Sequence, residues 1–192
     1  MAWPRDHKEK SRNRILESAM VLFSSRGFNK VSIEEVMRNA DLTHGSFYSH
    51  FKSKQELYAE AFKFAAKKSA VDKLPKNFEK DDRVLEKVLE KYLDFKHVKQ
   101  DITPCPLTFL VTDVANEEAG VRKAYTQSYN RLVAFINKQL TNEGALRKEK
   151  ALAISAMMIG SVAIARALEN KKTSESLLEA CKLIGTGLIN KK

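Results

Sequence analysis

Glycine and proline are scarce in this chain, with 7 Gly and 4 Pro among 192 residues. Because these residues mark most tight turns, their scarcity predicts few connections and long regular elements. Hydrophobic residues make up 43% of the sequence and charged residues 30%, which is the balance of a folded globular protein and not of a disordered or fibrous one. The composition favours an all-α fold.

Cysteine is scarcer still. Cys105 and Cys181 lie far apart in sequence and belong to no metal-type cluster, which argues against a disulfide framework or a zinc site. The four histidines form no metal-ligand pair at helical spacing, and neither a nucleophile elbow nor a phosphate-cradling glycine loop is present. We therefore expect no metal, no cofactor and no enzymatic activity.

Long hydrophobic runs are nearly absent. The N-terminal residues lack the apolar core of a signal peptide. Residues 151–168 form one borderline apolar run, but it contains Arg166 and many small residues, so we expect a buried bundle helix and not a membrane span. With its two cysteines, the chain is expected to be cytoplasmic and to have no membrane partner.

Positive charge is in excess, with a formal net charge of +10 and a pI of about 9.5. Residues 1–68 hold 13 Lys and Arg against 8 Asp and Glu, so positive charge is denser there than in the remainder. This charge makes a polyanion such as nucleic acid a natural partner. A helical adaptor that binds acidic proteins is the alternative that charge alone leaves open.

Helix-end patterns predict the first two helices. One should run from near Asp6 to Gly27, a residue that suits the left-handed position after a helix end. Ser32 and Glu35 form a capping box, so a short helix should run from there to about Asn39.

Two more helix starts follow. Thr43 begins a short helix with no acid three residues later, whereas Ser53 and Glu56 form a second capping box that opens a longer helix. Two short helices separated by residues 40–42 and held between longer ones have helix-turn-helix spacing. The sequence therefore predicts a helix-turn-helix at about residues 32–51.

Gly45 lies inside the second short helix, where glycine costs about 0.5 to 1 kcal/mol relative to alanine. In a helix-turn-helix this helix enters the major groove by its N-terminus, and a residue without a side chain lets the backbone approach the base edges. Thr43 and the backbone amides that follow it are expected to bind a phosphate, and His44 and Ser46 to reach base edges. Tyr48, Lys52 and Lys54 are expected to contact the DNA backbone. The predicted DNA-binding residues are Ser32, Thr43, His44, Gly45, Ser46, Tyr48, Lys52 and Lys54.

Residues 12–57 resemble the N-terminal DNA-binding domain of the tetracycline-repressor (TetR) family of bacterial transcription regulators. The resemblance rests on a first helix that ends in Phe-x-x-x-Gly-Phe and on Tyr-x-x-Phe-x-x-Lys at Tyr48, Phe51 and Lys54. Asp41 departs from the glycine usual in the family's turn, but Asp tolerates the left-handed conformation better than most residues.

The resemblance implies a division of function along the chain. Residues 1–53 would form a three-helix DNA-binding domain and residues 54–192 a helical ligand-binding and dimerisation domain, with about nine helices in all. It implies a homodimer on a palindromic double-stranded DNA operator, most often a repressor released by a small-molecule inducer.

Later helices are predicted at about residues 81–95, from Cys105 or Pro106, and at about 118–142, 148–168 and 174–189. The last two are rich in small residues that let helix backbones approach closely, which predicts a four-helix interface between two chains.

Aromatic residues of the central helices are candidates to line an inducer cavity, with ordinary core packing as the alternative for each. Cys105 has a further possible role, because a thiol at a helix N-terminus becomes more acidic and more reactive to electrophiles. The candidate ligand-binding residues are Phe62, Tyr92, Phe95, Cys105, Phe109, Tyr125 and Tyr129.

Overall fold

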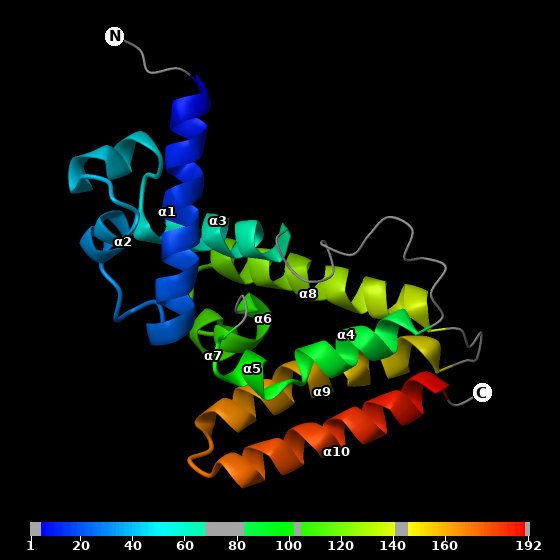
Figure 1. The fold of residues 1–192 in the computed structure, drawn as a ribbon. Helices are drawn as coiled ribbons and strands as arrows, with labels where there is room; N and C mark the ends of the chain where they lie inside the picture. Colours follow the sequence, from blue (N-terminus) through cyan, green and yellow to red (C-terminus); the bar gives the residue numbers. More distant parts are fainter. Residues whose placement is uncertain (1–4, 68–82, 102–104, 141–145, 191–192) are drawn as a thin grey trace. The chain divides into compact units, whose positions relative to one another are not determined.

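The computed structural model describes residues 5–67, 83–101, 105–140 and 146–190 (Figure 1). These residues form ten α-helices and one 3-10 helix, η1, and the same ranges contain no strand. In chain order the elements are α1 Arg5–Arg26, α2 Ile33–Asn39, η1 His44–Ser49, α3 Lys54–Lys67, α4 Val84–Tyr92, α5 Phe95–Val98, α6 Pro106–Phe109, α7 Val111–Val114, α8 Ala119–Gln139, α9 Arg147–Ala167 and α10 Lys171–Asn190.

The all-α prediction is confirmed. The expected nine helices become eleven because the structure adds α5 and divides the helix predicted at Cys105 into α6 and α7, and each of these three has four residues. Leu110 separates α6 from α7 with a ψ of 9°, outside helical geometry.

The chain divides into two compact units. One unit contains α1, α2, η1, α3, α6, α7 and residues 119–128 of α8; the other contains α4, α5, residues 129–139 of α8, α9 and α10. The boundary predicted after residue 53 separates two functions, whereas these units are defined by packing contacts. The functional boundary therefore stays a prediction.

The first unit begins with the helix ends that the sequence predicts. Gly27 has a φ of +82°, and its N–H donates to the carbonyl oxygen of Phe23 at 2.8 Å. The ring of Phe28 packs back on that of Phe23, with centroids 5.7 Å apart. At α2 both halves of the predicted capping box are present, since the Ser32 hydroxyl accepts from the Glu35 N–H and the Glu35 carboxylate accepts from the Ser32 N–H.

The second short helix begins after Thr43, as predicted, but it is a 3-10 helix and not an α-helix. Two serine side chains donate hydrogen bonds to backbone carbonyl oxygens here. The Ser46 hydroxyl donates to the Thr43 carbonyl at 2.7 Å, and the Ser49 hydroxyl donates to the Ser46 carbonyl at 2.7 Å. Such local bonds compete with the α-helical pattern, and Gly45 lowers helix propensity further. Phe47 beneath it is buried and anchors it to the core.

The start of α3 differs in one detail from the predicted capping box. The Ser53 hydroxyl accepts from the Glu56 N–H at 3.0 Å, as expected. The carboxylate of Glu56, however, accepts from the N–H of Lys52 at 2.6 Å and not from that of Ser53. The cap therefore spans one more residue and fixes the segment that joins η1 to α3.

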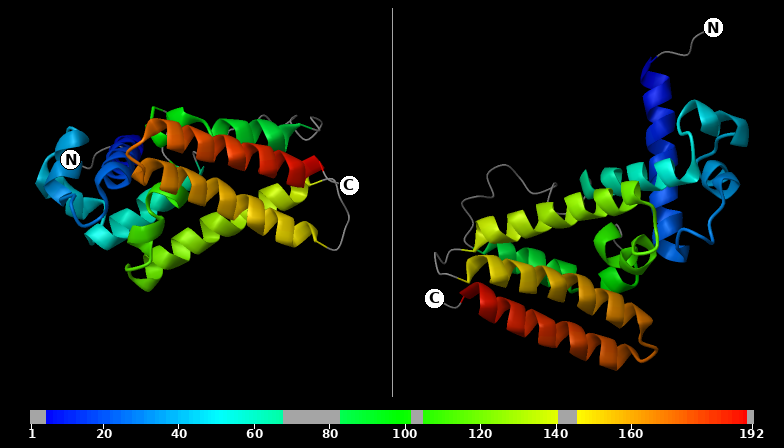
Figure 2. Two further views of the ribbon diagram at one scale, coloured as in Figure 1. Left: turned by 90° about the horizontal axis from the view of Figure 1, so that it is seen from below. Right: turned by 180° about the vertical axis from the view of Figure 1, so that it is seen from behind.

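In the second unit α9 and α10 run side by side in opposite directions (Figures 1 and 2), and α4 packs on α10. Gly185 makes this packing close, because a Cβ there would lie 2.7 Å from a methyl carbon of Leu89. Asn190 at the end of α10 donates to Glu86 on α4 at 2.7 Å. The buried apolar core includes Leu85, Leu89, Leu93, Ile136, Ile154, Met158 and Val162.

Helix α9 is the one helix of the described ranges that is long and apolar enough to cross a membrane by length and composition. Its apolar window is 44% buried within the structure. A core helix of a globular bundle has the same properties, so this feature is weak support for a membrane span.

Candidate nucleic-acid interface

The tip of η1 is an exposed surface. Gly45 is exposed, and a Cβ built on it would meet no atom within 4 Å. Tyr48 is 64% exposed, and its ring stands edge-on to that of His44 with centroids 6.2 Å apart. Phe47, by contrast, is fully buried. The protein's own packing therefore gives no reason for a glycine at position 45.

The N-terminus of η1 is polar and carries no acid in its first turn. Thr43 is the N-cap residue, and its side chain makes no capping hydrogen bond. The Ser46 hydroxyl donates to a backbone carbonyl but keeps its oxygen lone pairs, so it can still accept a hydrogen bond from a base. Ser32 is likewise exposed at the N-cap of α2, where its hydroxyl accepts from a backbone amide and retains its own proton to donate.

Asp41 adopts the left-handed conformation expected of the turn, with a φ of +49°. Its carboxylate pairs with the Arg14 guanidinium of α1 at 3.0 Å. Both side chains are exposed, so the pair contributes little to stability. It does place a positive charge beside the one acid of the turn.

The two predicted lysine contacts lie in different surroundings. Lys52 is exposed. Lys54 turns inward: its Nζ donates to the backbone carbonyl oxygen of Phe28 at 2.6 Å and lies 4.1 Å from the centroid of the Phe28 ring. Burial lowers the pKa of the Lys54 ammonium, and the negative charge of Glu117 opposes that effect.

The structure adds a basic neighbourhood that the sequence reasoning missed. His50 ends η1 half-buried, with no hydrogen-bond partner for its Nδ1. Burial and the positive charges of Lys8 and Arg12 lower its pKa. Arg12 also lies 4.8 Å from the centroid of the Phe51 ring. These groups come from α1 and from the end of η1, so only the tertiary fold brings them together, and no local pattern in the sequence could have found them.

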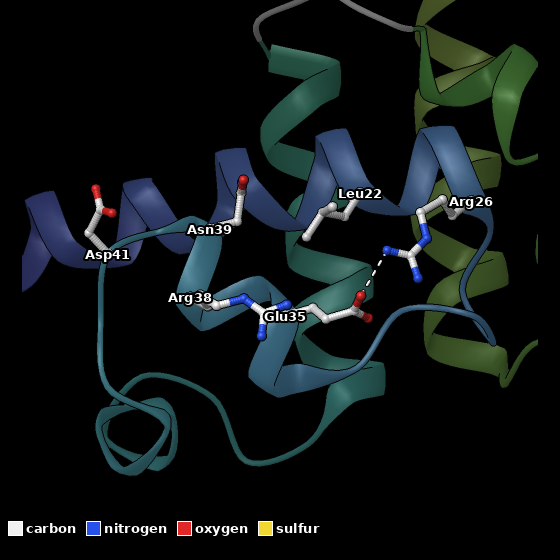
Figure 3. A pocket seen from close by; sticks show the side chains of 6 residues that line it. All are labelled: Leu22, Arg26, Glu35, Arg38, Asn39 and Asp41. Atoms are coloured by element: carbon white, nitrogen blue, oxygen red, sulfur yellow. Dashed lines mark hydrogen bonds and ion pairs between the residues drawn. The ribbon is translucent and has the colours of Figure 1, made fainter.

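A shallow groove of about 390 Å³ lies between α1 and α2 (Figure 3). The Arg26 guanidinium and the Glu35 carboxylate form an ion pair across it at 2.8 Å, drawn as a dashed line. The hydrogen bond from the Ser32 N–H and this arginine together lower the pKa of Glu35. None of the seven predicted ligand residues lines this groove, whose lining residues are Leu22, Arg26, Glu35, Arg38, Asn39 and Asp41.

The predicted ligand residues are shared between the two units. Phe62 and Tyr125 pack together in the first, with ring centroids 5.5 Å apart, and the Tyr125 hydroxyl donates to the Leu107 carbonyl at 3.0 Å. Half-buried Cys105 is the N-cap residue of α6, and half-buried Phe109 ends that helix.

In the second unit the Tyr92 ring stands edge-on to the ring of buried His97, with centroids 4.5 Å apart. The Tyr129 hydroxyl shares a hydrogen bond with that of Ser155 at 3.1 Å. Half-buried Phe95 has the ammonium of Lys171 5.6 Å from its ring centroid. All seven assignments stay predictions. Within the described ranges no group of three His, Cys, Asp or Glu side chains could hold a metal ion.

Comparison with known proteins places this surface in a known context. The sequence profile of the family described as "Bacterial regulatory proteins, tetR family" matches residues 15–61. The chain is 41% identical over 49 residues to the Transposon Tn10 TetC protein of Escherichia coli, covering 26% of this chain and 25% of that protein. It is 27% identical over 52 residues to IcaR of Staphylococcus aureus (strain Newman), a negative transcriptional regulator of the biofilm operon icaADBC, covering 27% and 28%.

These matches span about a quarter of the length of each relative. The likeness of fold extends further. The crystal structure of the reduced form of NemR from Escherichia coli superposes with a TM-score of 0.75 and 21% identity, covering 92% of this chain and 95% of that chain.

Proposed function

We propose that this chain, which belongs to the TetR family of bacterial regulatory proteins, is a DNA-binding transcriptional regulator that represses transcription from a palindromic operator. The observation that carries the proposal is the tip of η1. Gly45 is exposed, a Cβ added to it would meet nothing within 4 Å, and Tyr48 is 64% exposed, so the fold leaves this surface available to a partner. The proposed compartment is the cytoplasm, where the DNA lies.

The docking assigns a role to each exposed group. Thr43 and the free amides behind it bind a phosphate, because a helix start without an acid favours an anion. His44 and Ser46 face base edges in the major groove, and the Tyr48 hydroxyl and Lys52 contact the backbone. Ser32 and the start of α2 contact the neighbouring part of the DNA backbone in the same way.

We assign Lys54 a different part. Its ammonium is bound to the Phe28 carbonyl inside the unit, so it supports the helix-turn-helix from below. This contact, rather than a phosphate, accounts for the lysine of the Tyr-x-x-Phe-x-x-Lys pattern in this chain.

The proposed repressor is a homodimer, since a palindrome is read by two recognition elements about 34 to 36 Å apart. The outward faces of α9 and α10 carry exposed apolar side chains, and Leu183 is 74% exposed. Large exposed apolar residues gathered on two adjacent helices favour a protein interface. A second copy would cover Leu152, Ile164, Leu168, Leu183 and Ile184.

Dimerisation is tested by sedimentation of the purified chain at micromolar concentration. The wild type should sediment as a dimer and Leu183→Glu as a monomer, because a charge at the centre of an apolar interface is costly to bury. A wild-type chain that stays monomeric at every concentration would refute this interface.

We propose that a small molecule or an electrophile acts as inducer. An electrophile would react at Cys105, which is half-buried at the N-cap of α6. Thiol labelling of the intact protein tests this idea, with Cys105→Ser as the control for the second cysteine. An unlabelled Cys105 would leave a non-covalent ligand as the inducer.

DNA binding itself is tested by footprinting on the DNA upstream of the gene that encodes the chain. The expected result is a protected region with two-fold symmetry and an affinity that falls steeply between about 50 and 200 mM salt. Tyr48→Ala should weaken binding to all duplexes alike, because it removes a backbone contact. A chain that binds no duplex at low salt, or a Tyr48→Ala variant with unchanged affinity, would contradict the proposed docking.

A further inference from the structure

Phe28 is held by charged groups at its backbone N–H and at its backbone carbonyl oxygen. Its N–H donates to Oδ2 of Asp113 on α7 at 2.9 Å, and its carbonyl oxygen accepts from Nζ of Lys54 at the start of α3 at 2.6 Å. The side chain of Phe28 is 6% exposed and stacks on the ring of Tyr58, with centroids 4.7 Å apart. Hydrogen bonds to charged partners are stronger than neutral ones, and more so where water is excluded.

This residue sits at the base of the helix-turn-helix. Phe28 precedes the element at residues 32–51 and Lys54 follows it, so their hydrogen bond closes the chain on either side of it. Asp113 belongs to α7, far along the sequence but within the same compact unit. The orientation of the closed loop therefore depends on a side chain outside it.

Gly27 supports the same assignment. Its φ of +82° suits glycine, and a Cβ at this position would lie 2.9 Å from Oδ2 of Asp113. A side chain at position 27 would therefore push the Asp113 carboxylate away from its place beside the Phe28 amide. Gly27 at the end of α1 and Asp113 on α7 together position the Phe28 amide.

We propose that Asp113 is a positioning residue for DNA binding: by fixing the Phe28 amide opposite the Lys54 ammonium, it sets the orientation in which the helix-turn-helix meets the duplex. This inference rests on the proposed DNA-binding function. The functional unit that reads DNA then includes α7 in addition to the N-terminal helices, and a displacement of α7 changes the geometry of the helix-turn-helix.

Electrostatics alone predicts the opposite sign, which makes the test sharp. Loss of an acid raises the positive charge of the unit, and that change by itself strengthens binding to DNA. If Asp113 positions the helix-turn-helix, Asp113→Ala instead weakens binding, by about tenfold if the coupling has the usual size. Asp113→Asn keeps an oxygen that can accept from the Phe28 N–H and should recover most of the affinity.

The experiment measures the affinity of the full-length protein for the upstream DNA fragment that the wild type protects. Glu118→Gln is the matched control, because it removes an exposed acid nearby in the sequence, whereas the hydrogen bond to the Phe28 N–H comes from Asp113. It should bind as the wild type does or slightly tighter. The salt dependence of Asp113→Ala should keep the wild-type slope, since no phosphate contact is lost. Hydrogen exchange of the Phe28 amide should become faster in that variant.

Equal or tighter binding by Asp113→Ala would overturn the inference, and so would a reduced affinity that Asp113→Asn fails to restore. Should the alanine variant not fold, Asp113→Glu keeps the charge but displaces the acceptor oxygen, and the same weakening is expected; wild-type affinity in Asp113→Glu would overturn the inference. Failure of the wild type to bind any duplex is a separate result, which removes the proposed function itself and this inference with it.

Discussion

Replacement of Gly45 by alanine separates the needs of the fold from the needs of DNA binding. Gly45 is exposed, lies outside the left-handed φ region, and an added Cβ would meet no atom within 4 Å. Alanine at such a position stabilises a protein by about 0.4 to 1 kcal/mol, because it restricts the unfolded chain. For a chain of this size the melting temperature should rise by about 1 to 4 °C.

The same methyl group should weaken DNA binding. In the proposed docking the backbone at Gly45 lies against the base edges, so a methyl group there displaces the tip and its neighbouring contacts with bases. Loss of one good contact with a base costs about 1 to 3 kcal/mol. Because 1.4 kcal/mol corresponds to a tenfold change in affinity, the operator should bind about 5- to 150-fold more weakly.

The assay pairs thermal unfolding with titration of the protected DNA fragment, for the wild type and for each variant. Gly120→Ala is the matched control, because Gly120 is also exposed and helical and its added Cβ also meets nothing within 4 Å. It should give a similar gain in stability with unchanged affinity. A Gly45→Ala protein that binds the operator as tightly as the wild type would refute the close approach of this helix tip to the bases.

Three further predictions use other parts of the chain. His44→Ala should change the preference among operator sequences more than the affinity for random DNA, as measured by selection from a randomised duplex pool. Gly185→Ala should lower the free energy of unfolding by about 1 kcal/mol, because the added methyl would lie 2.7 Å from Leu89 and overpacking outweighs the gain in helix propensity; an increase like that expected for Gly120→Ala would contradict this packing. The pKa of Glu35 is lowered by the N-cap amide hydrogen bond and the arginine beside it, so its stabilisation is present above the unfolded pKa of about 4.5 and is lost as the pH falls through the lower, folded value. Glu35→Gln should therefore show a smaller drop in urea midpoint between neutral and acid pH than the wild type does.

Local patterns predicted the elements of this fold well. The left-handed end at Gly27 and the capping box at Ser32 and Glu35 each depend on residues within a few positions, and the structure has them as predicted. Such features are set by backbone sterics and side chains that are close in sequence.

Long-range contacts could not be predicted in the same way. Lys54 has the residue type and spacing of a phosphate contact, yet its ammonium is directed to the Phe28 carbonyl, which is 26 residues away. Asp113 carries no local pattern that indicates a partner at the end of α1. Residues 44–49 form a 3-10 helix and not the predicted α-helix. This difference depends on hydrogen bonds from the Ser46 and Ser49 hydroxyls, and no sequence pattern specifies the rotamers of these side chains.

The proposed DNA-binding surface at η1 combines buried aromatic residues with exposed polar residues. Phe47 and Phe51 are buried, whereas a Cβ added to Gly45 would meet nothing within 4 Å and Tyr48 is 64% exposed. Backbone N–H groups at a helix N-terminus that have no hydrogen-bond acceptor within the protein can donate to a bound partner. Truncation of an exposed side chain such as Tyr48 should therefore lower affinity for DNA and leave stability almost unaltered, whereas truncation of Phe47 should lower both, because removal of a buried ring costs about 3 to 5 kcal/mol.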